Sequence, residues 1–420
     1  MEEAKIKAFL IGIKDEKVSR EEAVSLSKEL ASLVNTLGLE IVSQETINVR
    51  ENHIRYGMGT GKAGELAQKA GSLKADCIVF DRNISPSQQR NWEKLSNIAV
   101  VDRQELIIQI FASRARTREA ELQARMAELI YSLPRLQHKY IDLSRQRGGR
   151  YGTRGSGETR LETDRRQVEQ RIHRLKEELE DIKRQRQVQR KMRERQGVPV
   201  CALVGYTNSG KSSIFNALTG AGVLAEDKLF ATLDSTSRRL ELPLGTQILL
   251  VDTVGFIRRL PHSLVNAFRS TLEEASHADI LLNVLDVSDE DTELQCETTL
   301  SVLRDLDAGN IPMITVLNKI DLLTPADSLF RLYPGSVAVS ALLGHGLTEL
   351  CQKIENTLSR GNACFRFPAE RTDLAALVHR SGFVISEKYG ENYIEINARV
   401  DERTAGRLRE YQLEGKQIHE

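Results

Sequence analysis

The 420-residue sequence is poor in cysteine, in aromatic residues and in long apolar runs. Its five cysteines lie far apart and never in CxxC spacing, which excludes a disulfide framework and a zinc ribbon. No stretch approaches the roughly 20 apolar residues that a membrane-spanning helix needs. Residues 1–5 also lack the basic region and apolar core that begin a signal peptide. We therefore expect a cytoplasmic protein.

The formal net charge is zero, with 59 basic and 59 acidic residues, which argues against a uniformly basic nucleic-acid binder. The charge is nevertheless segregated. Residues 112–200 contain 23 Lys+Arg and 13 Asp+Glu, a surplus of 10 positive charges, and the rest of the chain has the matching deficit. This segregation is typical of a segment that meets a polyanion, but a solvated helical face would have the same composition.

Hydrophobic periodicity divides the chain into four regions. Residues 1–103 alternate strand and helix patterns, which predicts a small parallel α/β domain. Residues 104–196 are wholly helical, and we expect an antiparallel, basic helical hairpin with a Gly-rich tip loop at 148–157. Buried-strand runs in residues 197–360 predict a larger α/β domain with a mixed sheet and flanking helices. Residues 361–420 predict a small α+β domain with a hairpin, so the expected fold class is α/β multidomain.

Proline interrupts the first half of the expected hairpin. Pro134 lies inside its apolar seam, where a missing backbone N–H and a bulky ring should kink or break the helix.

A phosphate-binding loop follows a buried strand at residues 200–204. The pattern GxxxxGK[ST] is complete, and a helix follows, as this motif requires. Backbone N–H groups of such a loop surround phosphates, Lys211 neutralises β/γ oxygens, and the Ser212 hydroxyl is a Mg²⁺ ligand. The expected nucleotide contacts from this loop are Gly205, Tyr206, Thr207, Asn208, Ser209, Gly210, Lys211, Ser212 and Ser213.

A second glycine cluster at residues 57–64 resembles a phosphate loop only in part. Tyr56 stands where the first glycine belongs, and Ala63 replaces the Ser/Thr. A tight turn into a helix is the favoured interpretation, with anion contact as the alternative.

Three further motifs follow the phosphate loop in order. The acidic residue of the first, which begins at Asp252, holds the Mg²⁺ shell, and its Gly255 amide can sense a γ-phosphate. In the second, Asp321 can accept hydrogen bonds from guanine N1–H and the 2-amino group, which adenine lacks as a pair. The third offers a backbone amide to guanine O6. The expected contacts are Asp252, Thr253, Val254, Gly255, Asn318, Lys319, Asp321, Ser340, Ala341 and Leu342, with GTP/GDP and Mg²⁺ as cofactors.

The order and spacing of these motifs resemble the translation-factor-related GTPases, which implies that residues 197–360 form a P-loop GTPase domain. That resemblance implies a switch-I role for Thr232, within Phe230, Ala231, Thr232 and Leu233, as a Mg²⁺ and γ-phosphate contact; an ordinary loop threonine is the alternative. The run from Asp252 to His262 and the run from Gly157 to Arg166 look like the HflX family of GTPases. Residues 56–62 and 81–90 look like the N-terminal domain of that family.

The HflX resemblance implies a cytosolic GTPase that binds the large ribosomal subunit and, in many members, splits or rescues stalled ribosomes. In that family the Gly-rich tip of the hairpin reaches towards the peptidyl-transferase region. Ser156 departs from the family pattern, which has proline at this position.

The catalytic glutamine of Ras-like enzymes is missing, because Phe256 occupies its position. We expect Phe256 to pack inside and intrinsic turnover to be slow, with stimulation by the ribosome. Asn208 matches the position at which several potassium-dependent GTPases hold K⁺, although it could simply shape the loop. The expected catalytic residues are Lys211, Asn208 and Thr232, and the expected metal ligands are Ser212 and Thr232.

Two kinds of partner fit the hairpin. In the first interpretation, arginines near the tip contact the phosphates and bases of rRNA, and the chain acts as a monomer. These arginines are Arg145, Arg147, Arg150, Arg154 and Arg160. In the second, the chain is a nucleotide-gated interaction module or a ribosome-assembly GTPase whose hairpin binds a protein, since heptad surfaces usually pair with proteins.

Overall fold

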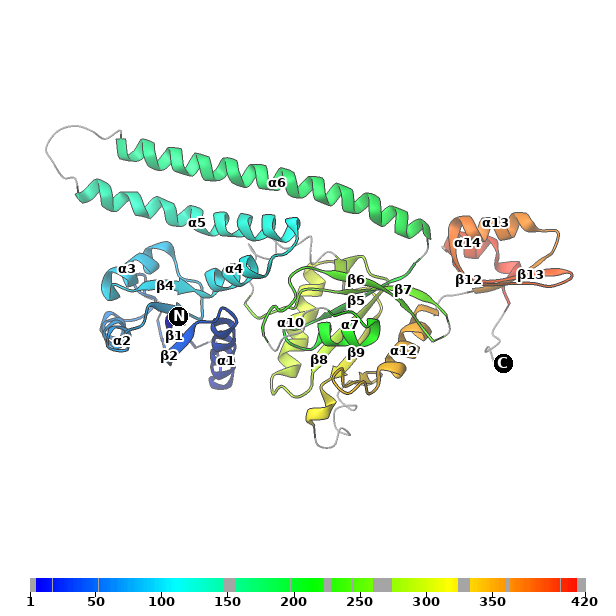
Figure 1. Ribbon diagram of the computed structural model, residues 1–420, viewed down its shortest axis with the longest axis horizontal. Helices are drawn as coiled ribbons and strands as arrows, with labels where there is room; N and C mark the ends of the chain where they lie inside the picture. Colours follow the sequence, from blue (N-terminus) through cyan, green and yellow to red (C-terminus); the bar gives the residue numbers. More distant parts are fainter. Residues whose placement is uncertain are drawn as a thin grey trace. The chain divides into compact units, whose positions relative to one another are not determined.

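The computed structural model divides the chain into two compact units. The first comprises residues 1–184, 224–234 and 254–272, and the second comprises residues 185–223, 235–253 and 273–420. The structure describes residues 5–16, 18–51, 53–146, 156–196, 198–222, 228–243, 245–259, 274–323, 333–359, 363–400 and 402–413. Helices and strands carry the labels of Figure 1.

The first unit contains a four-stranded sheet in the order β2-β1-β3-β4, and all of its pairs are parallel. Its strands are β1 (Lys7–Lys14), β2 (Glu40–Asn48), β3 (Cys77–Phe80) and β4 (Ala99–Asp102). Its helices are α1 (Arg20–Thr36), α2 (Thr60–Ser72), α3 (Pro86–Ser96) and α4 (Arg103–Arg114). The expectation of a small parallel α/β fold at the N-terminus is confirmed.

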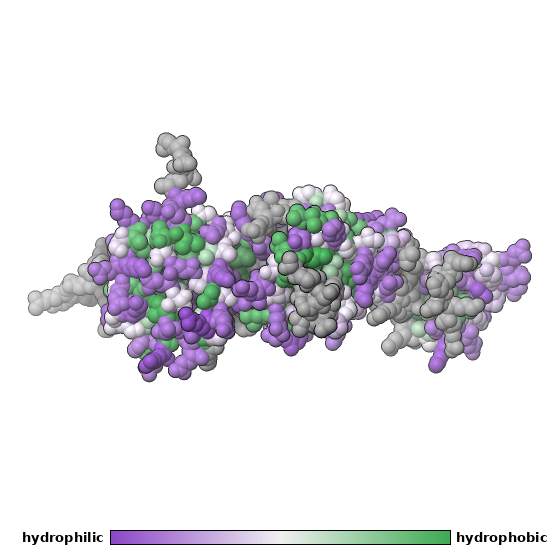
Figure 2. All heavy atoms as spheres, turned by 90° about the horizontal axis from the view of Figure 1, so that it is seen from below, coloured by the Kyte–Doolittle hydropathy of each residue, from purple (hydrophilic) through white to green (hydrophobic). Residues whose placement is uncertain are grey.

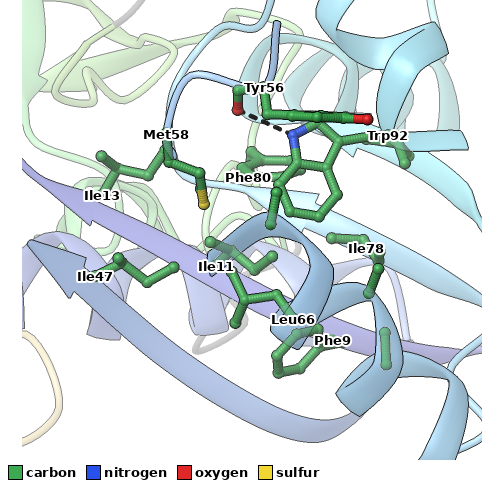
Figure 3. Packing of buried hydrophobic residues seen from close by; sticks show 14 of the residues in the cluster. Phe9, Ile11, Ile13, Ile47, Tyr56, Met58, Leu66, Ile78, Phe80 and Trp92 are labelled. Atoms are coloured by element: carbon green, nitrogen blue, oxygen red, sulfur yellow. Dashed lines mark hydrogen bonds between the residues drawn. The ribbon is translucent and has the colours of Figure 1, made fainter. Parts of the chain in front are cut away.

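An apolar core on this sheet orders the loop before α2 (Figure 3). Trp92 is fully buried, and its indole Nε1–H donates to the Tyr56 carbonyl at 3.0 Å. Tyr56 and Met58 are buried in the same cluster, and α2 starts at Thr60 with Gly59 as its N-cap. The second glycine cluster is therefore a tight turn into a helix, as the favoured interpretation held.

Two long helices follow, α5 (Arg118–Gln146) and α6 (Ser156–Gln196). They lie side by side (Figure 1), and Arg118 Nη2 at the start of α5 is 2.6 Å from Glu178 Oε2 in α6. That pairing fits antiparallel helices.

The expectation was that Pro134 would kink or break its helix, and the break does not occur, because α5 continues through this residue. The residues around the proline are fixed from outside the helix. Arg135 Nη2 pairs with Asp102 Oδ2 at 3.1 Å, and the Tyr131 hydroxyl donates to Glu105 Oε2 at 3.1 Å. Both neighbours of the proline are therefore tied to β4 and α4.

The second unit is built on a six-stranded sheet in the order β10-β9-β8-β5-β7-β6. Only its β6–β7 pair is antiparallel, which confirms the expected mixed sheet. The strands are β5 (Val200–Gly205), β6 (Thr236–Glu241), β7 (Gln247–Asp252), β8 (Ile280–Asp286), β9 (Met313–Asn318) and β10 (Val337–Ala338). The helices are α7 (Lys211–Thr219), α10 (Thr292–Asp305), α12 (Leu347–Ser359) and the short 3₁₀ turn η1 (Ile320–Leu322).

The end of the chain forms a three-stranded antiparallel sheet in the order β11-β13-β12. The expected helix and hairpin are present as α13 (Thr372–Ser381), β12 (Gly382–Tyr389) and β13 (Tyr393–Val400). The sequence did not predict β11 (Ala363–Pro368), whose Phe365 and Phe367 are fully buried. The last elements are α14 (Glu402–Arg407) and the turn η3 (Arg409–Tyr411).

On the face drawn in Figure 2, hydrophilic side chains separate the apolar residues into small groups. Within the part of the chain that is described, no helix is long and apolar enough to cross a membrane.

Candidate nucleotide site

The loop between β5 and α7 requires glycine at both ends. Gly205 has φ +145° and Gly210 has φ +92°, conformations that residues with a side chain rarely adopt. A Cβ on Gly205 would approach the Val284 carbonyl oxygen, and one on Gly210 would approach Asn318 Nδ2, both closer than 3.0 Å. The two glycines therefore let the loop close against β8 and β9.

Lys211 lies buried under this loop. Its Nζ donates to the carbonyl oxygens of Tyr206 at 2.6 Å and Gly205 at 3.2 Å. Burial lowers the pKa of Lys211 to about 8, and the nearby Asp252 carboxylate opposes part of that decrease. A bound phosphate would favour the charged ammonium in the same way, so the side chain is placed to neutralise an anion.

Two buried hydroxyls of the loop fit a phosphate ligand. Thr207 and Ser209 are 5% and 1% exposed, and among the described residues neither side-chain oxygen has a hydrogen-bond partner. Buried hydroxyls are normally paired, and each of these can donate to a phosphate oxygen.

The candidate Mg²⁺ site lies where the start of α7 meets the end of β7. The Ser212 hydroxyl donates to Asp252 Oδ2 at 2.6 Å, and the Thr253 hydroxyl donates to the Leu203 carbonyl at 2.6 Å. A hydroxyl beside a carboxylate is a suitable oxygen ligand set for Mg²⁺. Thr232, the other expected ligand, belongs to the first compact unit, whereas Ser212 belongs to the second.

Asn318 links the phosphate loop to the segment around Ala341. Its Nδ2 donates to the Ser209 carbonyl at 2.9 Å, and its Oδ1 accepts from the Ala341 amide at 3.2 Å. The next motif residue, Asp321, is exposed, and its Oδ1 accepts a hydrogen bond from the Ser340 hydroxyl at 2.5 Å. An oriented, exposed carboxylate can therefore receive the two guanine donors.

Leu342 is 83% exposed and available to contact a planar base, as is expected for this end of the site.

One contributor to the site was missed by sequence reasoning. Asp286 Oδ2 pairs with Lys319 Nζ at 2.6 Å and so supports a lysine whose backbone is left-handed, with φ +65°. Asp286 ends β8 directly beside Asn318 at the end of β9. An acidic residue at the carboxyl end of a buried strand was the available signal.

Family models match most of the chain. Residues 25–112 match the N-terminal region of the GTP-binding GTPases, and residues 114–193 match their middle region. Residues 200–319 match the 50S ribosome-binding GTPase model.

Curated relatives agree over nearly the whole length. GTPase HflX of Akkermansia muciniphila is 45% identical over 92% of this chain and 92% of its own. The chain belongs to the HflX family of GTPases. GTPase HflX of Escherichia coli is 43% identical over 79% of each chain. Among solved structures, a GTP-binding protein from Sulfolobus solfataricus in complex with GDP is 25% identical, with a TM-score of 0.45 over 84% of this chain and 99% of that chain.

As an HflX-family member, the chain is an enzyme that hydrolyses GTP. Phe256 is 2% exposed, so it packs inside, as expected, and cannot orient the attacking water. Of the five arginines expected to meet RNA, Arg147, Arg150 and Arg154 lie outside the described residues. Arg145 and Arg160 lie in α5 and α6, where their side chains are not described.

Proposed function

We propose that this chain binds the large ribosomal subunit and that the ribosome accelerates its otherwise slow GTP hydrolysis, so that stalled ribosomes are split or rescued. The match of residues 200–319 to the 50S ribosome-binding GTPase model carries the proposal. Buried Phe256 in place of a catalytic glutamine supports the dependence on a partner, since the chain supplies no side chain there to position water.

In this proposal, the helical hairpin carries the chain to rRNA. The surplus of 10 positive charges falls on residues 112–200, which include α5 and α6. Guanidinium groups at the tip would pair with phosphates and stack on splayed bases. The chain would act in the cytoplasm as a monomer.

Tip arginines can be tested by co-sedimentation with 50S subunits. We expect Arg150, Arg154 and Arg160 changed together to Ala to weaken pelleting with a GTP analogue by about tenfold or more and to lower its dependence on salt. The affinity for GTP should persist, because the nucleotide site lies elsewhere in the chain.

A matched control removes three exposed cations from the middle of α6, at Arg171, Arg174 and Lys176. Equal losses in both triple variants would show that nonspecific charge, and not the tip, carries the binding. The ribosome proposal would be contradicted if the fraction pelleted were the same with the GTP analogue as with GDP, and the same in the tip variant as in the unchanged protein.

We also propose that Ser212 and Thr232 hold Mg²⁺ on GTP and that Asn208 holds K⁺ beside the phosphates. Asn208 has a left-handed backbone with φ +64°, which a loop-shaping role alone would also require. Asn318 and Asp321 would recognise the base, with Ser340, Ala341 and Leu342 completing that side.

A comparison of monovalent cations tests Asn208. At equal ionic strength, GTP turnover should be several-fold faster in KCl than in NaCl, because K⁺ supplies positive charge to the transition state. Asn208→Ala should remove this difference, and Asn208→Asp, which keeps an oxygen ligand, should preserve it. Equal rates in the two salts would exclude the K⁺ role.

A further inference from the structure

Both nucleotide-sensing segments of the GTPase fold with the N-terminal sheet. Residues 228–234, which include Thr232, and residues 254–259, which include Val254 and Gly255, are part of the first compact unit.

The segment after Gly255 is held by a buried ion cluster. Arg258 is 8% exposed, and its Nε is 3.3 Å from Glu29 Oε2 in α1. The Arg258 guanidinium also bonds the Ser25 hydroxyl, and its backbone carbonyl accepts from Arg103 Nη2 at 3.2 Å. Both the side chain and the backbone of Arg258 are thus held in place, which restricts the positions that the preceding residues, including Gly255, can take.

The same cluster extends to the next arginine. Arg103, only 1% exposed, pairs with Glu29 and, at 2.8 Å, with Asp81 Oδ1. Arg259 Nη1 is 3.4 Å from the other oxygen of Asp81. We call Glu29, Asp81, Arg103, Arg258 and Arg259 the carboxylate–arginine cluster. Buried charges are tolerated only when they are paired, so the cluster accepts few other arrangements.

Residues 228–234 are anchored independently on either side of Thr232. Phe230 is buried and packs edge-on against Phe111 of α4, with 4.7 Å between ring centroids. The Asp234 carboxylate accepts from the backbone N–H of Thr117 at 3.1 Å and from its hydroxyl at 2.5 Å. Thr232 is therefore two residues from an anchor in each direction.

We infer that Glu29 and Thr117 are positioning residues that set the preference of this enzyme for GTP over GDP. Only GTP has a γ-phosphate, the group that Thr232 and Gly255 would contact in the proposed site. Segments that are already ordered lose less conformational entropy on binding, which favours the ligand that needs them. The inference rests on the nucleotide site proposed above and extends it to residues that touch no nucleotide.

The test compares the affinities for a non-hydrolysable GTP analogue and for GDP in the full-length chain. Glu29→Gln keeps the shape of the side chain and removes its charge. We expect the analogue to bind about tenfold more weakly, equivalent to about 1.4 kcal/mol, while GDP affinity stays within about twofold. Glu21→Gln is the matched control, because the same change is made on an exposed residue of α1.

Glu29→Gln removes the charge that pairs with two buried arginines, so this variant could misfold. Two milder variants therefore test the same anchors. Ser25→Ala removes one hydrogen bond to Arg258, and Thr117→Val removes one to Asp234. Both should lower analogue affinity selectively, and Thr117→Ser, which keeps the hydroxyl, should restore it. Retained GDP binding reports a folded nucleotide site in each variant.

An unchanged ratio of GTP-analogue to GDP affinity in the three variants would overturn the inference. Tighter binding of the GTP analogue to these variants would also overturn the inference, because the anchors would then be holding the segments away from the phosphate. If the proposed nucleotide site itself were wrong, the result would be different, because Asp321→Asn would then leave the affinities for both nucleotides unchanged.

Discussion

Asp321→Asn should weaken binding of both GDP and GTP by about 100-fold or more and create measurable affinity for the xanthine nucleotides. The carboxylate can accept from guanine N1–H and the 2-amino group together, and the Ser340 hydroxyl, 2.5 Å from its Oδ1, holds it in place. An amide offers one acceptor and one donor, so an N–H would face the guanine amino group. Unpaired polar groups at a recognition site give large discrimination.

Xanthine has a carbonyl where guanine has that amino group, so the asparagine amide can donate to it. Equilibrium titration with fluorescent guanine and xanthine nucleotides measures both affinities. Asp305→Asn, the same change at an exposed residue of α10, is the control and should alter neither. A loss of guanine binding with no gain for xanthine would point to a damaged loop and not to base recognition.

Gly210→Ala should abolish binding of both nucleotides within the measurable range, a loss of about 100-fold or more. The strained φ of +92° alone costs about 1–2 kcal/mol for a residue with a side chain. The added methyl group would also overlap Asn318 Nδ2. Asn318 would have to move, and it is the residue that ties Ser209 in the phosphate loop to Ala341 near the base.

Gly220→Ala is the control that separates the effect of backbone strain from the effect of a steric clash with Asn318. Gly220 ends the same helix, α7, with a left-handed φ of +66°, but a Cβ there would meet no atom within 4 Å. This control should lose thermal stability and keep nucleotide affinity. If the two variants bound GDP equally well, the contact between Gly210 and Asn318 would not control the site.

Much of the fold was predictable because its signals are local. Alternating strand and helix patterns predicted the parallel sheet of β1 to β4, and the complete GxxxxGK[ST] pattern predicted the turn from β5 into α7. Pro134 shows the limit of local reasoning. The helix continues through this proline, and its neighbours Arg135 and Tyr131 contact residues of β4 and α4 that are remote along the chain.

By itself, the sequence determined the class of the enzyme, since motifs in fixed order and spacing specify phosphate and guanine recognition wherever they fold. Only the tertiary structure decided which residues of the different motifs contact one another. It brought Asn318 between Ser209 and Ala341, and it joined Arg258 to Glu29 across 229 positions. Charges so far apart in sequence leave no periodic trace, and their pairing arises only when burial forces each to find an opposite charge.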